Sequence, residues 1–319
     1  MIQYKYLELG VTGMARAYRT GPFSGHLGAA LVAGYGFGEE LPTLPDGVYR
    51  GIEGELDRIL RGEESIWYDA EKVGIAVPEL FAPFPAGQPG GVDPAPIAKA
   101  LEENIDALHQ SGHNVIFAAL AIRAFKDHPQ LATRDRLSGL VKLIRGFNGT
   151  IPGKAYLGQD RGGWVNGDQI ELNKAMDVEP YESVEAMVRR TVDEVIASAH
   201  IRRRGLGSMW HIINHAAGLL DLATYGYREL ARKGLAAHRD HLRLWRSLPD
   251  VGDEVGRLPK AAYDPRSEYF WSQQETFKRD DARLTHRIKT LYGFSRLMTV
   301  ETDKSRQERA WDQLRYLMA

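Results

Sequence analysis

The sequence predicts an all-α protein whose 319 residues form a single helical domain. Two observations support this fold class. Alternating strand patterns are nearly absent, whereas many stretches show the three- and four-residue apolar spacing of helices. Several other stretches are apolar on nearly every side, and a helix of that kind must be buried. Buried inner helices backed by amphipathic outer helices predict a toroid or a solenoid, and the pattern leaves both open.

The composition limits the class of protein and its partners. Hydrophobic residues make up 43% of the chain and charged residues 26%, which is ordinary for a globular protein. The 41 basic and 42 acidic residues nearly cancel, so nucleic acid is not an expected partner. The lack of cysteine excludes disulfides, thiolate metal sites and a cysteine nucleophile. The sequence shows no secretory signal and no apolar run that could span a bilayer, so we expect a cytoplasmic protein without a membrane partner. The pattern does not indicate an oligomeric state.

Two similar stretches predict the first buried helices. Residues 24–35 begin Ser-Gly-His and continue with small apolar residues, and residues 111–122 begin Ser-Gly-His again before a second apolar run. Ser24 is the expected N-cap of the first helix. Amphipathic helices are expected around these two, at residues 48–60, 97–108 and 133–144. Proline and glycine predict a long loop at residues 74–96.

The second half of the chain continues the same theme. Glycine-rich residues 146–167 predict a loop that matches neither a P-loop nor a dinucleotide fingerprint. An amphipathic helix at 182–200 leads to three consecutive arginines, Arg202, Arg203 and Arg204, whose charge suits the negative end of a helix dipole. The apolar stretch at 205–222 is the third expected buried helix. Further helices are expected at residues 227–248, from Asp280 through 292, and at 305–318.

The helix expected at 205–222 carries two histidines, His211 and His215. Residues four apart share a helix face, with Cβ atoms about 5–6 Å apart, so we expect the two imidazoles to project together. Such a pair suits metal binding or acid–base chemistry. The alternative is that both are core histidines bonded to neighbouring carbonyl groups.

Three more histidines stand at or near the start of predicted buried helices: His26, His113 and His286. If the inner helices surround one cavity, these imidazoles converge with His211 and His215, and we take all five as candidate catalytic residues. Local helix capping is the alternative for His26 and His113. A metal site needs a third ligand beside the 211/215 pair, expected to be His113 or His286, and nitrogen ligands suit zinc or iron.

The remaining histidines fall at polar or terminal positions, so we expect them at the surface: His109, His128, His200, His238 and His241. Two familiar metal motifs are absent, because Ile212 stands where zinc proteases have glutamate and no Glu-x-x-His pair recurs. A carbohydrate-cleaving toroid needs two carboxylates, yet Asp221 is almost the sole acid on the buried helices.

The order of these histidine helices resembles the questin oxidase-like family. The resemblance rests on residues 24–33, residues 112–121, the His211 to His215 stretch and residues 285–289. It implies an all-helical oxygenase that acts on polyketide-derived aromatic ketones by Baeyer–Villiger-type oxygen insertion, with NADPH as reductant. The expected function is therefore an oxidoreductase that transforms a hydrophobic aromatic ketone in a histidine-lined pocket. The alternatives are a helical interaction scaffold with structural histidines and an α/α-toroid enzyme of other chemistry.

Overall fold

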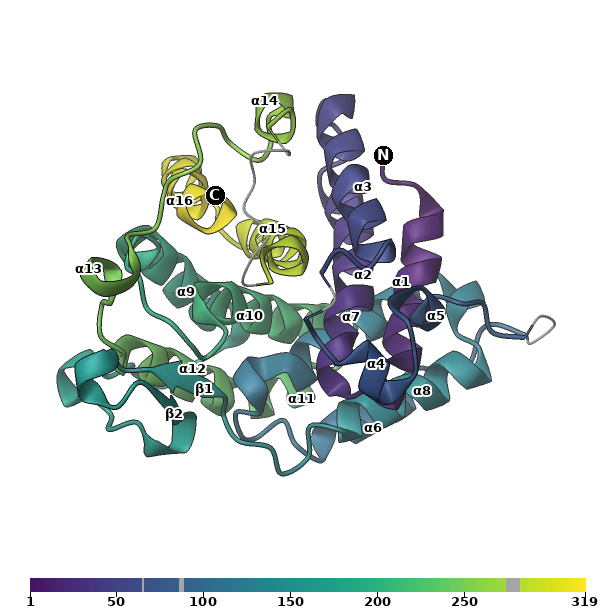
Figure 1. Cartoon of the computed structure of the whole chain (residues 1–319), viewed down its shortest axis with the longest axis horizontal. Coiled ribbons are helices and arrows are strands. Elements are labelled where there is room, and N and C mark those ends of the chain that lie inside the picture. The colour runs from purple at the N-terminus through teal and green to yellow at the C-terminus, as the bar shows by residue number, and fades with distance from the viewer. Residues whose placement is uncertain (65, 86–88, 274–281) are drawn as a thin grey trace.

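The computed structural model describes residues 1–64, 66–85, 89–273 and 282–319, and it confirms the all-α class (Figure 1). In this part of the chain the one sheet is an antiparallel pair, β1 (Lys154–Tyr156) and β2 (Trp164–Asn166), within the predicted glycine-rich loop. Asp280, the expected first residue of a late helix, lies outside the described residues. None of the described helices is long and apolar enough to cross a lipid bilayer.

Four buried helices form the centre of the molecule: α2 (Gly25–Glu40), α7 (His113–Asp127), α10 (Ser208–Thr224) and α15 (Arg283–Met298). They pack in a cycle, because α2 contacts α7, α7 contacts α10, α10 contacts α15, and α15 contacts α2. These are the stretches that are apolar on nearly every side, so the prediction that they are buried is confirmed. A closed toroid or an open solenoid stays a prediction.

The four inner helices run parallel to one another. On α10 and α15, His211 lies beside His286 and Asp221 lies beside Arg296, so the register is constant along the pair. Ion pairs also join the last turns of α7 and α2, where Arg123 and Glu40 are 2.7 Å apart, and those of α15 and α2, where Arg296 and Glu40 are 3.0 Å apart. All four helices therefore begin on the same side of the inner layer, and ion pairs join them on the other side.

Outer helices cover this centre with one apolar face each. On α3 (Asp46–Leu60), for example, Val48, Ile52 and Leu56 are buried as their spacing predicts. The other outer helices pack on the inner four or on one another: α1 (Tyr4–Arg16), α6 (Ala95–Glu102), α8 (Arg134–Arg145), α9 (Val184–Ser198), α11 (Arg228–Lys233), α12 (Leu235–Ser247) and α16 (Lys304–Met318). Four short helices lie in the connections: α4 (Ala70–Val73), α5 (Val77–Leu80), α13 (Gly252–Val255) and α14 (Glu268–Trp271).

One close approach explains the small residues of α2. A Cβ atom on Gly28 would lie 2.4 Å from the Met14 nitrogen and 2.5 Å from the Gly10 oxygen. The backbones of α1 and α2 are therefore in direct contact, and only glycine fits between them. This contact fixes the first turns of α2, which carry His26.

Candidate functional site

Each of the four inner helices carries one histidine in its first turn, and the structure brings these four imidazoles together. The ring centroids of His26 and His113 are 4.5 Å apart, and those of His113 and His211 are also 4.5 Å apart. His286 completes the group, with its ring 4.7 Å from that of His211 and 5.0 Å from that of His26. We call these four residues the cavity cluster.

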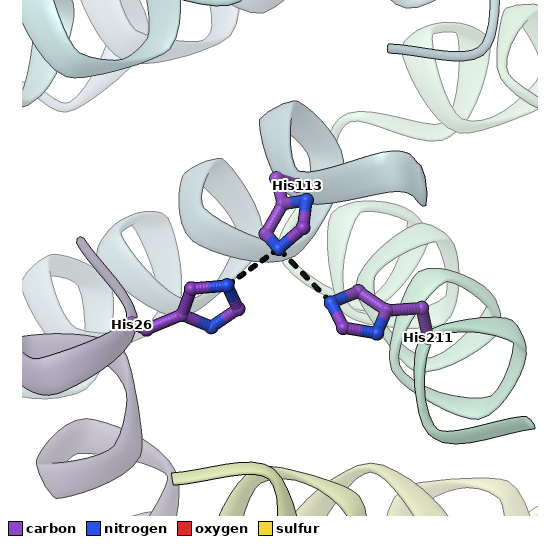
Figure 2. Close-up of side chains that lie close together, drawn as sticks. All are labelled: His26, His113 and His211. Atoms are coloured by element: carbon purple, nitrogen blue, oxygen red, sulfur yellow. Dashed lines mark hydrogen bonds between the residues drawn. The ribbon is translucent and has the colours of Figure 1, made fainter. Parts of the chain in front are cut away.

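Three of the rings point their Nε2 atoms at one another, as Figure 2 shows. The Nε2 atom of His113 lies 2.7 Å from that of His26 and 2.9 Å from that of His211. The ligand nitrogens of these three residues all lie within 4.8 Å of one another. They form a compact set of three imidazole donors at the end of the helix layer.

The other ring nitrogen is held by the backbone in three of the four histidines. Nδ1 of His211 donates to the Gly207 carbonyl at 2.8 Å, and Nδ1 of His286 donates to the Ala282 carbonyl at 2.8 Å. Nδ1 of His113 bonds the Gln110 carbonyl in the same way. Because a carbonyl oxygen only accepts, each ring carries its proton on Nδ1, and each neutral ring therefore presents a lone pair on Nε2.

Left-handed turns supply these carbonyl groups. The described non-glycine residues with positive φ all lie just before a histidine helix or at its first residue: Gln110, Ser111, Leu206, Ser208 and Ala282. Gly112 and Gly207 share the same conformation in the first two turns. Left-handed backbone is costly for residues that have a Cβ atom, and it persists where the surrounding structure demands it. The strain of this fold is thus concentrated at the starts of α7, α10 and α15.

Burial keeps the cluster uncharged. Desolvation lowers the pKa of His113 to about 3, and it lowers the pKa values of His26, His211 and His286 well below the usual 6.5. Lys289 is also fully buried, contacts Nδ1 of His26, and has a pKa far below its usual value because of desolvation. The centre therefore holds neutral nitrogen bases rather than cations.

Two tryptophans and a buried carboxylate fix the rings from outside. Trp67 stacks on His26 with a centroid separation of 3.7 Å, and Trp210 stacks on His286 at 5.0 Å. Glu64 accepts hydrogen bonds from the backbone nitrogens of Leu284 and Thr285, at 2.8 and 3.1 Å, and from Trp67 Nε1 at 3.3 Å. One carboxylate thus caps the first turn of α15 and anchors an aromatic wall of the site.

A cavity of about 390 Å³ opens onto the cluster. Its inner end is formed by the four histidines, and aromatic side chains form much of its wall: Phe23, Trp67, Trp164, Trp210 and Trp245. Enclosed pockets of this size and character typically bind small molecules. None of the described lining residues is an aspartate or glutamate, so the described part of the wall supplies no pair of carboxylates for glycoside chemistry.

The prediction that His215 projects with His211 is wrong. The ring of His215 lies 5.2 Å from that of His238 and 5.6 Å from that of His241, in a group that we call the packed cluster. The cavity lies at the end of α10 rather than along its side. A residue one helical turn further on, such as His215, therefore falls below the site and packs against the next helix.

The prediction that His238 and His241 lie at the surface is also wrong, because both are fully buried. They share a face of α12 with Leu242 and Trp245, at the spacing of an apolar stripe, and this face packs on α10. Their ring nitrogens are satisfied there. Nε2 of His238 bonds the Ile212 carbonyl at 3.2 Å, and Nε2 of His241 bonds the Leu206 carbonyl at 2.8 Å. Of the other three, His200 is exposed, whereas His109 and His128 are half-buried.

Sequence reasoning missed several residues of the site. Lys289 stands one turn after His286 on the same buried helix, and that spacing, which places both on one face, was the available signal. Arg202, Arg203 and Arg204 lie beyond the end of α9, at Ser198, and line the cavity rather than acting as helix-end cations. Comparisons of the chain with models of known protein families, with curated proteins and with solved structures found no match.

Proposed function

We propose that the chain is a metal-dependent oxidoreductase in which His26, His113 and His211 hold one metal ion beside a cavity for a hydrophobic aromatic ketone. The observation that carries this proposal is the direction of the lone pairs. A histidine that binds a metal typically donates one ring N–H to a backbone carbonyl or a carboxylate, and it offers the lone pair of its other ring nitrogen to the metal. His113 and His211 have this arrangement, and without a cation between them two acceptor nitrogens face each other at 2.9 Å.

The donor set fits a transition metal. Imidazole nitrogens suit zinc, copper, iron and nickel, and no thiolate is present in the chain. Ligand nitrogens about 2.1 Å from a metal are separated from one another by roughly 3 to 3.4 Å. The two Nε2 separations that involve His113, 2.7 and 2.9 Å, need a few tenths of an ångström of outward movement to reach that range. The ligand nitrogens of His26 and His211 lie within 4.8 Å of each other and would have to reach the same range.

His286 and Lys289 are the nearest further groups. Nε2 of His286 is buried and has no hydrogen-bond partner among the described residues. Because burial keeps this imidazole neutral, it is available either as a fourth ligand or as the base that accepts a proton from the substrate. Lys289 contacts the far nitrogen of His26 and thereby orients that ring.

A redox-active metal in this position would supply the activation of molecular oxygen. In the reaction that the family resemblance implies, one oxygen atom enters the bond between the carbonyl carbon and its neighbour, which converts a ketone to an ester. The other oxygen atom leaves as water, with two electrons from NADPH and two protons. The chain itself contributes a cavity with aromatic walls, in which Trp67 and Trp210 support the rings that face the substrate.

Elemental analysis of protein purified without a histidine tag tests the metal. We expect about one iron or copper ion per chain, in line with the three imidazole donors and with oxygen activation. A zinc ion would support the metal site but contradict the oxygen-activating function, because zinc has no redox chemistry. The His113→Ala variant should lose the ion while its circular dichroism stays helical, and the matched His200→Ala variant, changed at an exposed histidine, should keep it. Oxygen consumption with an aromatic ketone and NADPH tests the reaction class. Wild-type protein that neither contains nor binds a metal would favour the scaffold with structural histidines.

A further inference from the structure

We infer that the substrate of this cavity is an aromatic molecule with an anionic oxygen group, a carboxylate or a phenolate, that faces a cationic wall. The inference rests on the proposed function, because it takes the cavity to be the substrate site. It adds the charge of the substrate, which neither the histidines nor the tryptophans specify.

The charge of the cavity wall differs from that of the chain. Across the sequence, 41 basic residues balance 42 acidic ones. Among the described residues that line the cavity, there are five lysines and arginines and no acidic side chain: Lys154, Arg202, Arg203, Arg204 and Arg283. A cleft lined by one sign of charge and walled by apolar groups concentrates ligands of the opposite sign. The local imbalance therefore favours an anion.

Buried arginines elsewhere in the protein are paired with carboxylates. Arg287 lies 3.1 Å from Glu55, and Arg296 lies 2.7 Å from Asp221. By contrast, Lys154, Arg203 and Arg204 form no salt bridge with any described residue, although they lie in the cavity wall. Arg203 and Arg204 are half-buried, whereas Lys154 is exposed. Glu194 and Asp250 act on Arg203 without forming a salt bridge to it, so a ligand can supply the direct counterion that the two arginines lack.

Arg203 and Arg204 are held in place by aromatic rings instead. The guanidinium of Arg203 lies 4.5 Å from the Trp245 ring centroid, and its Nε donates to the Leu248 carbonyl at 2.9 Å. Its Nη1 is buried and has no acceptor among the described residues. Arg204 lies 5.6 Å from the ring centroids of both Tyr156 and Trp164, on the β1–β2 hairpin. Fixed guanidinium groups of this kind recognise carboxylate and phenolate oxygens at little entropic cost.

The inner helices add to the positive electrostatic potential in the cavity. All four begin at the cavity cluster, so the positive ends of their dipoles face the inner end of the cavity. The apolar wall supplies the other half of the recognition, because the tryptophans offer flat surfaces for a ring. Together these features fit an aromatic ketone that also carries an anionic oxygen group better than a neutral one.

A matched pair of probes tests the charge. The test compares the affinities of 2-naphthoic acid and its neutral amide, 2-naphthamide, by calorimetric titration at one fixed salt concentration. The acid should bind about tenfold tighter or more, as a charge-assisted hydrogen bond predicts. In Arg203→Gln and Arg204→Gln this preference should nearly disappear while the amide binds as before. The matched Arg257→Gln variant, changed at an exposed arginine outside the cavity, should behave as wild type. Lys154→Gln, also at an exposed residue, should reduce the preference in part without a folding risk.

The outcomes separate this inference from the proposed function. Equal affinity for the acid and the amide, or a loss of both in the arginine variants, would overturn the inference even if the protein contains metal. A preference for the acid in a protein that binds no metal would sustain the inference and reject the metal-dependent function. If the arginine variants instead lose only affinity for NADPH, the wall binds the phosphates of the reductant and the inference is wrong.

Discussion

The two histidine clusters share burial but differ in where their protons point. In both clusters, desolvation lowers the imidazole pKa values, to about 3 for His113 in the cavity cluster and for His238 in the packed cluster. In the packed cluster, His238 bonds the Ile212 carbonyl with Nε2 and the Tyr181 hydroxyl with Nδ1, at 3.2 and 3.3 Å. In the cavity cluster, His113 and His211 point their Nδ1 protons outward to backbone carbonyls, and their Nε2 lone pairs face each other. Burial and a low pKa are therefore common to both clusters, and the facing lone pairs are what support the proposed metal site.

The packed cluster also supports the cavity cluster from below. His241 donates to the carbonyl of Leu206, which begins the left-handed turn before α10. The ring of His215 lies against Gly112, in the turn before α7, where an added Cβ atom would be 2.6 Å from Nδ1. Each of these contacts fixes a turn whose carbonyl orients a cavity histidine. The two clusters differ in chemistry but are joined through the strained turns.

The largest difference should appear when one member of each cluster is replaced by alanine. His113→Ala removes the nitrogen that faces both neighbours, so metal affinity should fall by more than the roughly 100-fold that loss of a supporting group can cause. His238→Ala should destabilise the fold but leave the metal affinity of the folded protein within a few-fold of wild type. Chelator competition measures the affinity and urea unfolding measures the stability. Equal loss of metal in both variants would contradict the division into two clusters.

A methyl group on Gly112 should disturb both clusters at once. Gly112 has φ +82°, and a Cβ atom would meet the His215 ring, so Gly112→Ala combines backbone strain with a clash. We expect about 1–3 kcal/mol of destabilisation and weaker metal binding. Gly74→Ala is the control, since Gly74 has φ +70° and nothing within 4 Å of the added atom. If the two variants lose equal stability and both keep metal, the His215 contact has no importance for the site.

Acid should weaken the fold through the packed cluster. Burial places the folded pKa of His238 at about 3 and that of His241 at about 4, below the unfolded value of 6.5. The unfolded state therefore binds more protons below pH 6.5, so stability is full above that pH and is lost as pH falls toward 4. Each histidine contributes up to about 1.4 kcal/mol per pH unit in this window. His238→Gln should reduce the slope by about one proton in urea unfolding, and His200→Gln should not change it.

Helix periodicity predicted which helices are buried. It did not predict which helix faces pack against one another. The inner helices could be found because they are apolar on nearly every side, and His26 and His113 stood at recognisable helix starts. His238 and His241 were misplaced because charged neighbours on α12 concealed that they share its apolar stripe with Trp245. The basic wall could not be predicted, since it forms where residues 153–164 meet residues 201–211 across the tertiary structure. Sequence spacing does not record such contacts.

The smallest effect should come from His241, which acts on the site only through the Leu206 carbonyl. Because it supports the residue before Gly207 rather than a ligand directly, we expect a loss of metal affinity below the about tenfold typical of direct supporting partners. His241→Leu removes the donor and should show this loss, whereas the side-chain amide of His241→Gln can still donate to the carbonyl and should restore affinity. Both variants are compared by chelator competition at equal folded fraction. If His241 acts in packing alone, the metal affinity of the folded protein should be unchanged in both variants. A lower affinity in His241→Leu than in His241→Gln would identify the hydrogen bond to Leu206 as the link between the clusters.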